Sequence, residues 1–160
     1  MAKFVGIDAT FAELRVAVAA FEQQAVEETK RAARVVTESL FEHTPVWSGE
    51  TIRNFTWGIG TPPAGGAKPV IGSGDPGPTN SMPMGSEPRR PANEAAVMSE
   101  LNAALSFNKL ADLFVTNTVA ATKWNLVDSG VAPAPGQARN PGGVEVPALQ
   151  SARGRLPNWK

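Results

Sequence analysis

The residues that could carry acid–base or nucleophilic chemistry are few. The sequence contains one histidine, His43, and no cysteine, which excludes thiolate nucleophiles, disulfides and cysteine metal sites. A single histidine also makes a histidine-rich zinc site or a Ser-His-Asp triad hard to assemble. None of the candidate acidic residues has a spacing that would fix two carboxylates together, such as Glu-x-x-His on a helix face. The candidate acids are Glu42, Glu50, Asp75, Asp112 and Asp128.

The neighbourhood of Glu42, His43 and Glu50 is the one place where an acid–base site could form. Glu42 and His43 are adjacent, so on a helix their side chains point about 100° apart and do not share a metal. His43 is better suited to complement the carbonyl groups at the end of a helix. Ser48-Gly49 lacks the second glycine of a nucleophile elbow, and the glycine-rich segment after residue 60 lacks the Gly-Lys-Ser/Thr of a phosphate loop. We therefore predict no catalytic, cofactor-binding or metal-binding residue, and no enzyme.

The amino-acid composition limits the classes of protein to which the chain can belong. The chain has 160 residues with 15 Lys and Arg against 15 Asp and Glu, which is one domain's length with no net charge. A neutral chain lacks the basic surface typical of a nucleic-acid-binding domain. No apolar stretch reaches the roughly 18 residues of a membrane span. These features predict a soluble binding or structural protein.

Residues 10–44 have the pattern of one long amphipathic helix. Its apolar face advances in alternating steps of three and four through Phe11, Leu14, Val18, Phe21 and Ala25. Thr10 and Glu13 have the spacing of a capping box at the start, and Pro45 ends the pattern. The simplest interpretation of the stripe is a core helix. Some 33 residues nevertheless make a rod of about 50 Å, longer than the roughly 40 Å diameter of such a domain. We expect the helix to bend, or its thinner second half to pack on another chain.

Glycine and proline separate the other elements. Residues 51–60 and 113–119 are β-rich, residues 123–127 form a further short strand, and residues 92–106 form a second helix with Ala95 and Leu101 on its apolar side. We expect Trp57, Trp124 and Phe114 to lie in the core. Residues 61–90 are a Gly/Pro-rich loop, and such long loops tend to be functional. Residues 140–160 are again proline-rich, which predicts an extended C-terminal arm.

Four segments in this order resemble a family of tail-component proteins from tailed bacteriophages. Residues 44–54 (TPVWSGETIRN) are similar to the family's Pro-Val-Asp-Thr-Gly-x-Leu-Arg-x-Ser turn and strand, and Phe55-Thr56-Trp57 matches its aromatic strand. Residues 113–118 (LFVTNT) resemble its Leu-Tyr-Ile-Thr-Asn-Asn strand, and residues 128–139 (DSGVAPAPGQAR) its Gln-Ala-Pro-x-Gly-x-x-Arg run. The chain departs from the pattern in lacking tyrosine, in Ser48, and in its last 20 residues.

The resemblance implies a structural virion protein at the head–tail junction. Family members form neck rings, commonly of six copies, in a tail-completion or terminator role between the tail tube or sheath and the head connector. They act without a cofactor, contact no membrane, and meet DNA only as it passes through the lumen. The chain would be made in the host cytoplasm and located in the virion. The implied fold is α+β: a long helix packed on a small twisted, mostly antiparallel sheet.

Residues 1–139 then form a single α+β domain with the 61–90 loop as an insertion, followed by the 140–160 arm. We expect one of these two segments to contact adjacent chains in a ring. Two other functions remain open. One is a small non-viral intracellular binding adaptor without catalysis, and the other is an enzyme that uses Glu42, His43 and Glu50.

Overall fold

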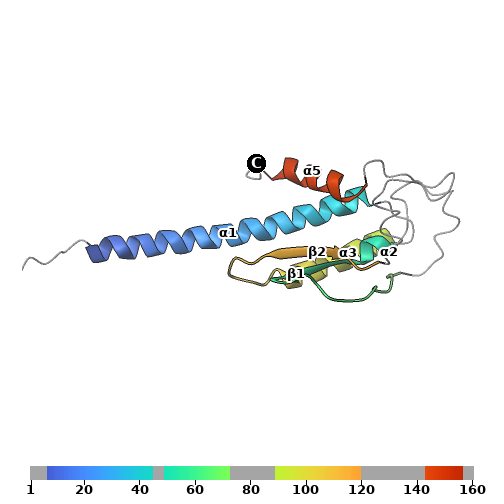
Figure 1. Cartoon of the computed structure of the whole chain (residues 1–160), viewed down its shortest axis with the longest axis horizontal. Helices are drawn as coiled ribbons and strands as arrows, with labels where there is room; N and C mark the ends of the chain where they lie inside the picture. The colour runs from blue at the N-terminus through green and yellow to red at the C-terminus, as the bar shows by residue number, and fades with distance from the viewer. Residues whose placement is uncertain (1–6, 45–48, 73–88, 120–142, 157–160) are drawn as a thin grey trace, which may run out of the picture.

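The computed structural model describes residues 7–44, 49–72, 89–119 and 143–156. The described part has an α+β fold, as expected, with a long N-terminal helix, short helices and a two-stranded antiparallel sheet (Figure 1). Its elements are α1 (Ile7–His43), α2 (Glu50–Arg53), β1 (Phe55–Ile59), α3 (Arg90–Ala104), β2 (Leu113–Asn117) and α5 (Glu145–Arg155). The strand expected at 123–127 and the tryptophans at 47, 124 and 159 lie outside the described residues.

Helix α1 has 37 residues, which corresponds to a length of about 55 Å. It begins at Ile7, so the capping box predicted at Thr10 falls inside the helix and does not mark its start. At the other end the Thr44 hydroxyl donates a hydrogen bond to the Leu40 carbonyl (2.6 Å), and Arg90 of α3 donates to the Phe41 carbonyl (2.7 Å). Both carbonyl groups lie in the last turn, where carbonyls lack partners inside the helix, and both also accept the Thr44 backbone N–H.

Only the second half of α1 belongs to the core. Its buried apolar residues are Val26, Ala33, Val36, Leu40 and Phe41. Every residue from 9 to 24 is exposed, and in Figure 1 this half extends beyond the sheet and the other helices. The interpretation of the Phe11–Phe21 stripe as core is therefore wrong, and the thinner second half, which we expected to pack on another chain if the helix did not bend, packs on its own chain. Periodicity shows that a face is apolar, but the position of the other elements decides which part of it is covered.

The sheet packs one face on the helices. Phe55 pairs with Asn117 and Trp57 with Val115, so these residues share a face. Phe55 is buried, and Trp57 packs against both hydrophobic clusters, as predicted. Phe114 pairs with Gly58 on the other face and is only half-buried. The expected core position of Phe114 is wrong because it is one residue out of phase with Val115.

The strand expected from residue 51 begins only at Phe55. Gly49 has φ +70°, a left-handed conformation that favours glycine. It precedes the single helical turn of α2. This turn buries Ile52 completely in the same cluster as Phe55. The apolar pattern of residues 51–60 thus spans a turn of helix and a strand, which alternation alone does not separate.

Helix α3 buries Asn93, Val97 and Leu101, at steps of four. Ala95, expected on the apolar side, is exposed. The buried face therefore includes a polar residue, Asn93, that a search for an apolar stripe passes over.

Residues 145–155 form helix α5, which corrects the expectation of an extended arm over this part of 140–160. Pro147 lies in the first turn, where its missing N–H removes no helical hydrogen bond. Ala148 and Ala152 are completely buried together with Val144, in one cluster with Val36 of α1. Small side chains allow two helices to approach closely, so this segment can pack despite its few large apolar residues.

Candidate functional site

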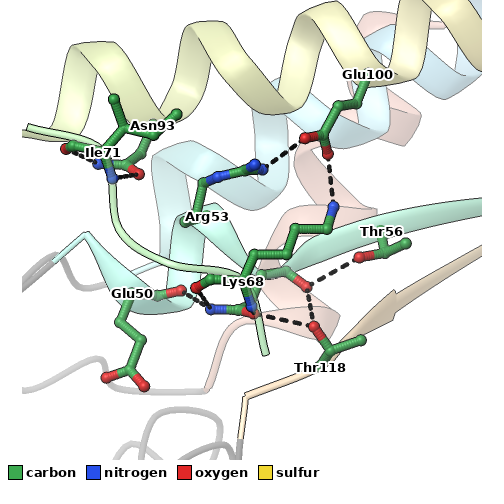
Figure 2. Close-up of polar contacts among 9 residues, drawn as sticks. Glu50, Arg53, Thr56, Lys68, Ile71, Asn93, Glu100 and Thr118 are labelled. Carbon is green, nitrogen blue, oxygen red and sulfur yellow. Dashed lines mark hydrogen bonds and ion pairs between the residues drawn. The ribbon is translucent and has the colours of Figure 1, made fainter. Parts of the chain in front are cut away.

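The described structure keeps the candidate acid–base residues apart. Glu42 lies 3.3 Å from the Arg155 guanidinium of α5. The Nδ1 atom of His43 lies 2.9 Å from the Ser39 carbonyl in the last turn of α1. The carboxylate of Glu50 points away from the other labelled side chains of Figure 2. Asp112 is exposed, whereas Asp75 and Asp128 lie outside the described residues.

Within the four described ranges, no three His, Asp or Glu side chains are grouped to hold a metal ion. No helix there combines the length and apolar character needed to cross a bilayer.

The main polar cluster of the described residues joins α2, α3 and the segment after β1 (Figure 2). Glu100 of α3 forms ion pairs with two basic side chains. One carboxylate oxygen lies 2.8 Å from the Arg53 guanidinium, and the other lies 2.5 Å from the Lys68 ammonium. Burial by itself would raise the pKa of Glu100. The hydrogen bonds and positive charges of Lys68 and Arg53 outweigh that effect and lower the pKa below its ordinary value. The arrangement favours the ionised carboxylate, which suits a structural ion pair.

Asn54, which directly precedes β1, bonds three separate segments of the chain. Its side-chain oxygen accepts hydrogen bonds from the Lys68 backbone N–H (2.7 Å) and the Thr118 hydroxyl (3.0 Å). Its side-chain nitrogen donates to the Glu50 carbonyl (2.7 Å). The residue is completely buried. One amide side chain thus connects α2, the loop at Lys68 and Thr118, the residue that follows β2.

Asn93 of α3 binds the loop a few residues further on, at Ile71. Its side-chain oxygen accepts from the Ile71 N–H (2.9 Å) and its nitrogen donates to the Ile71 carbonyl (3.0 Å). An amide that pairs with both backbone groups of one residue imitates a neighbouring strand. Two buried asparagines therefore hold residues 68 and 71 on their own chain.

The loop also approaches the sheet closely. A Cβ atom at Gly58 would lie 2.2 Å from the Thr61 carbonyl oxygen and 2.8 Å from Pro63, so only glycine fits there. Residues 61–72 are accordingly part of the protomer, although the loop was expected mainly as a contact for adjacent chains. Sequence reasoning missed this role because nothing in the spacing of Asn54 and Asn93 distinguishes a buried amide from an exposed one.

Arg90, at the start of α3, makes its contacts inside the protomer: it bonds Glu94 and the end of α1.

The candidate interaction surface is the exposed half of α1, residues 9–24. Its exposed large apolar residues are Phe11, Leu14, Val16, Val18 and Phe21. Two of its residues between positions 9 and 21, Glu13 and Arg15, carry charge. Large exposed apolar patches are typical of interaction surfaces in proteins. Comparison with protein-family models, curated proteins and solved structures gives no significant match.

Proposed function

We propose that this protein is a structural virion component of a tailed bacteriophage. It forms a ring in the neck and joins the tail tube to the head connector, in a tail-completion or terminator role. The single observation that carries the assembly role is the exposed apolar half of α1. Phe21 is 71% exposed and Phe11 55% exposed in the isolated chain, and burying such side chains is worth about 1.5–3 kcal/mol each. A partner chain supplies that burial.

The phage assignment rests on the resemblance of the motifs, and their positions support it. Two of the motifs, FTW at 55–57 and LFVTN at 113–117, are distant in sequence but form paired strands, with Trp57 opposite Val115. Gly49, the glycine of the turn motif, has the left-handed conformation that requires this residue type. The resemblance therefore concerns residues that position one another.

The protomer has a suitable form for a ring. A ring subunit must present different surfaces to its two neighbours, and a helix that extends beyond its own core offers such a surface. Glu42, Glu100 and His43 make contacts within the protomer, which favours an assembly role over catalysis.

Particles made without this protein test the proposal. Electron microscopy should show filled heads and separate tails, and the wild-type protein supplied from a plasmid should restore joined particles. Antibody labelling of complete virions should mark the neck. Normal joined particles in its absence, or virions that do not contain it, would contradict the proposal and favour a non-virion binding adaptor.

A further inference from the structure

The exposed half of α1 has two different apolar faces. One, which we call the ridge, carries large side chains that are 48–71% exposed: Phe11, Leu14, Val18 and Phe21. The other, which we call the alanine face, carries Ala9, Ala12, Val16 and Ala19, all exposed. Both advance in alternating steps of three and four residues. At 100° per residue their centres lie about 160° apart around the helix.

The two faces are complementary in size. Two helices pack most closely when the large side chains of one helix lie opposite small side chains of the other. Steps of three and four are those of helices that pack side by side over several turns. Glu13 and Arg15 lie on the two edges between the faces, so neither charge has to be buried when both faces are covered.

We propose that the ridge of one copy packs on the alanine face of the next copy, with the α1 helices parallel and side by side. A second copy is the occupant that fits, because the same helix carries both a surface and its complement. An antiparallel pair formed through the ridge would leave Val16, which is 71% exposed, and the alanine face uncovered. The contact is heterologous, so repeating it gives a ring when the rotation from one copy to the next closes, and an open filament otherwise. The inference deepens the proposed ring function and rests on it for closure alone.

Disulfide cross-linking tests the contact in the full-length protein, which has no native cysteine. The variant Leu14→Cys/Val16→Cys carries one thiol on the ridge and one on the alanine face, and Val18→Cys/Val16→Cys allows for a shift along the helix. After mild oxidation with copper phenanthroline, we expect at least one double variant to give a ladder of covalent multimers. Each single variant should stay monomeric on a non-reducing gel, because like faces do not meet. All substituted residues are exposed in the monomer, so the thermal midpoint should not change.

A covalent dimer from Leu14→Cys alone, without a ladder from the double variants, would overturn the proposal in favour of an isologous pair. Absence of cross-links from every variant would overturn it as well. If electron microscopy shows rings of the purified protein in that case, the ring function stands and only this contact fails. If there are neither rings nor cross-links, both fail.

A size substitution gives a second readout. Ala19→Trp fills the alanine face and should weaken self-association about tenfold or more, since overpacking a fitted surface is that costly. Glu13→Gln, on the edge, is the matched control. Unchanged association of Ala19→Trp, measured by sedimentation at several concentrations, would contradict the proposed contact.

Discussion

At the scale of single residues, Asn54 shows how a buried amide can replace backbone pairing. Lys68 and Thr118 belong to segments that approach β1 from different directions, and both bond the same side-chain oxygen. A buried polar group is costly unless it is paired, so the amide specifies the position of both segments. The directional hydrogen bonds of Asn54 fix the position of the loop, which apolar contacts alone would not do.

Asn54→Ala should therefore destabilise the protein by about 2–3 kcal/mol, because it leaves buried donors without partners. Urea denaturation followed by tryptophan fluorescence measures the loss. Asn108→Ala, at an exposed position, is the control and should change stability by less than about 0.5 kcal/mol. An equal effect of the two substitutions would show that the Asn54 contacts do not hold the loop.

The ion pairs of Glu100 predict that the stability of the fold depends on pH. Its pKa in the folded state is lowered from 4.5, so its ionised form favours folding. This contribution is complete above the unfolded value and is lost as the pH falls through the lower folded value. At neutral pH Glu100→Gln should cost no more than about 1 kcal/mol, since the carboxylate is 44% exposed.

The difference between wild type and Glu100→Gln should vanish in acid, below the folded pKa. Urea titrations from pH 7 to pH 2.5 would measure it, with Glu22→Gln on the exposed half of α1 as control. A difference that stayed constant across this range would exclude the ion pairs of Arg53 and Lys68 as its source.

At the scale of elements, α5 depends on close approach to α1. Ala148 and Ala152 are completely buried, and Arg155 adds ion pairs to Glu38 and Glu42. Ala152→Leu should separate the two helices and cost about 1–3 kcal/mol. Ala95→Leu, on the exposed side of α3, should be nearly neutral. Thermal denaturation of the two variants compares them, and equal midpoints would contradict the packing of α5.

Trp57 links the two hydrophobic clusters across the sheet. Trp57→Ala should destabilise the fold by about 3 kcal/mol, the lower end for loss of a large core side chain, because the residue is only half-buried. Phe114→Ala should cost less, because Phe114 lies on the other face of the sheet. Chemical denaturation gives the order of the two effects, and the reverse order would require a different register from Phe55 opposite Asn117.

At the scale of the whole molecule, one half of α1 packs on its own chain and the other half, residues 9–24, is exposed. A helix of about 16 residues without tertiary packing is only marginally stable in water. Amide hydrogens of residues 9–24 should therefore exchange faster than those of residues 26–43 in dilute solution. Hydrogen exchange followed by mass spectrometry at rising protein concentration should show protection growing in the first range alone. Equal protection at all concentrations would contradict burial of this half in an assembly.

Local pattern was sufficient for several features of this protein. The spacing of apolar residues gave α1 almost in full, the position of α3 within two residues, and the strand at 113–117. The phase of Trp57 was also correct. These features depend on the periods of helix and strand, which are properties of neighbouring residues.

Only the tertiary structure decided which part of α1 is covered, that residues 145–155 form a helix, and that two asparagines hold the loop. Each of these outcomes depends on residues far apart in sequence: Ala152 of α5 clusters with Val36 of α1, and Asn93 bonds Ile71. An apolar stripe looks the same whether its own chain or another copy buries it. A polar side chain likewise looks the same whether it is solvated or paired inside the core. The free energy that distinguishes these cases comes from the partner surface, which a local pattern does not contain.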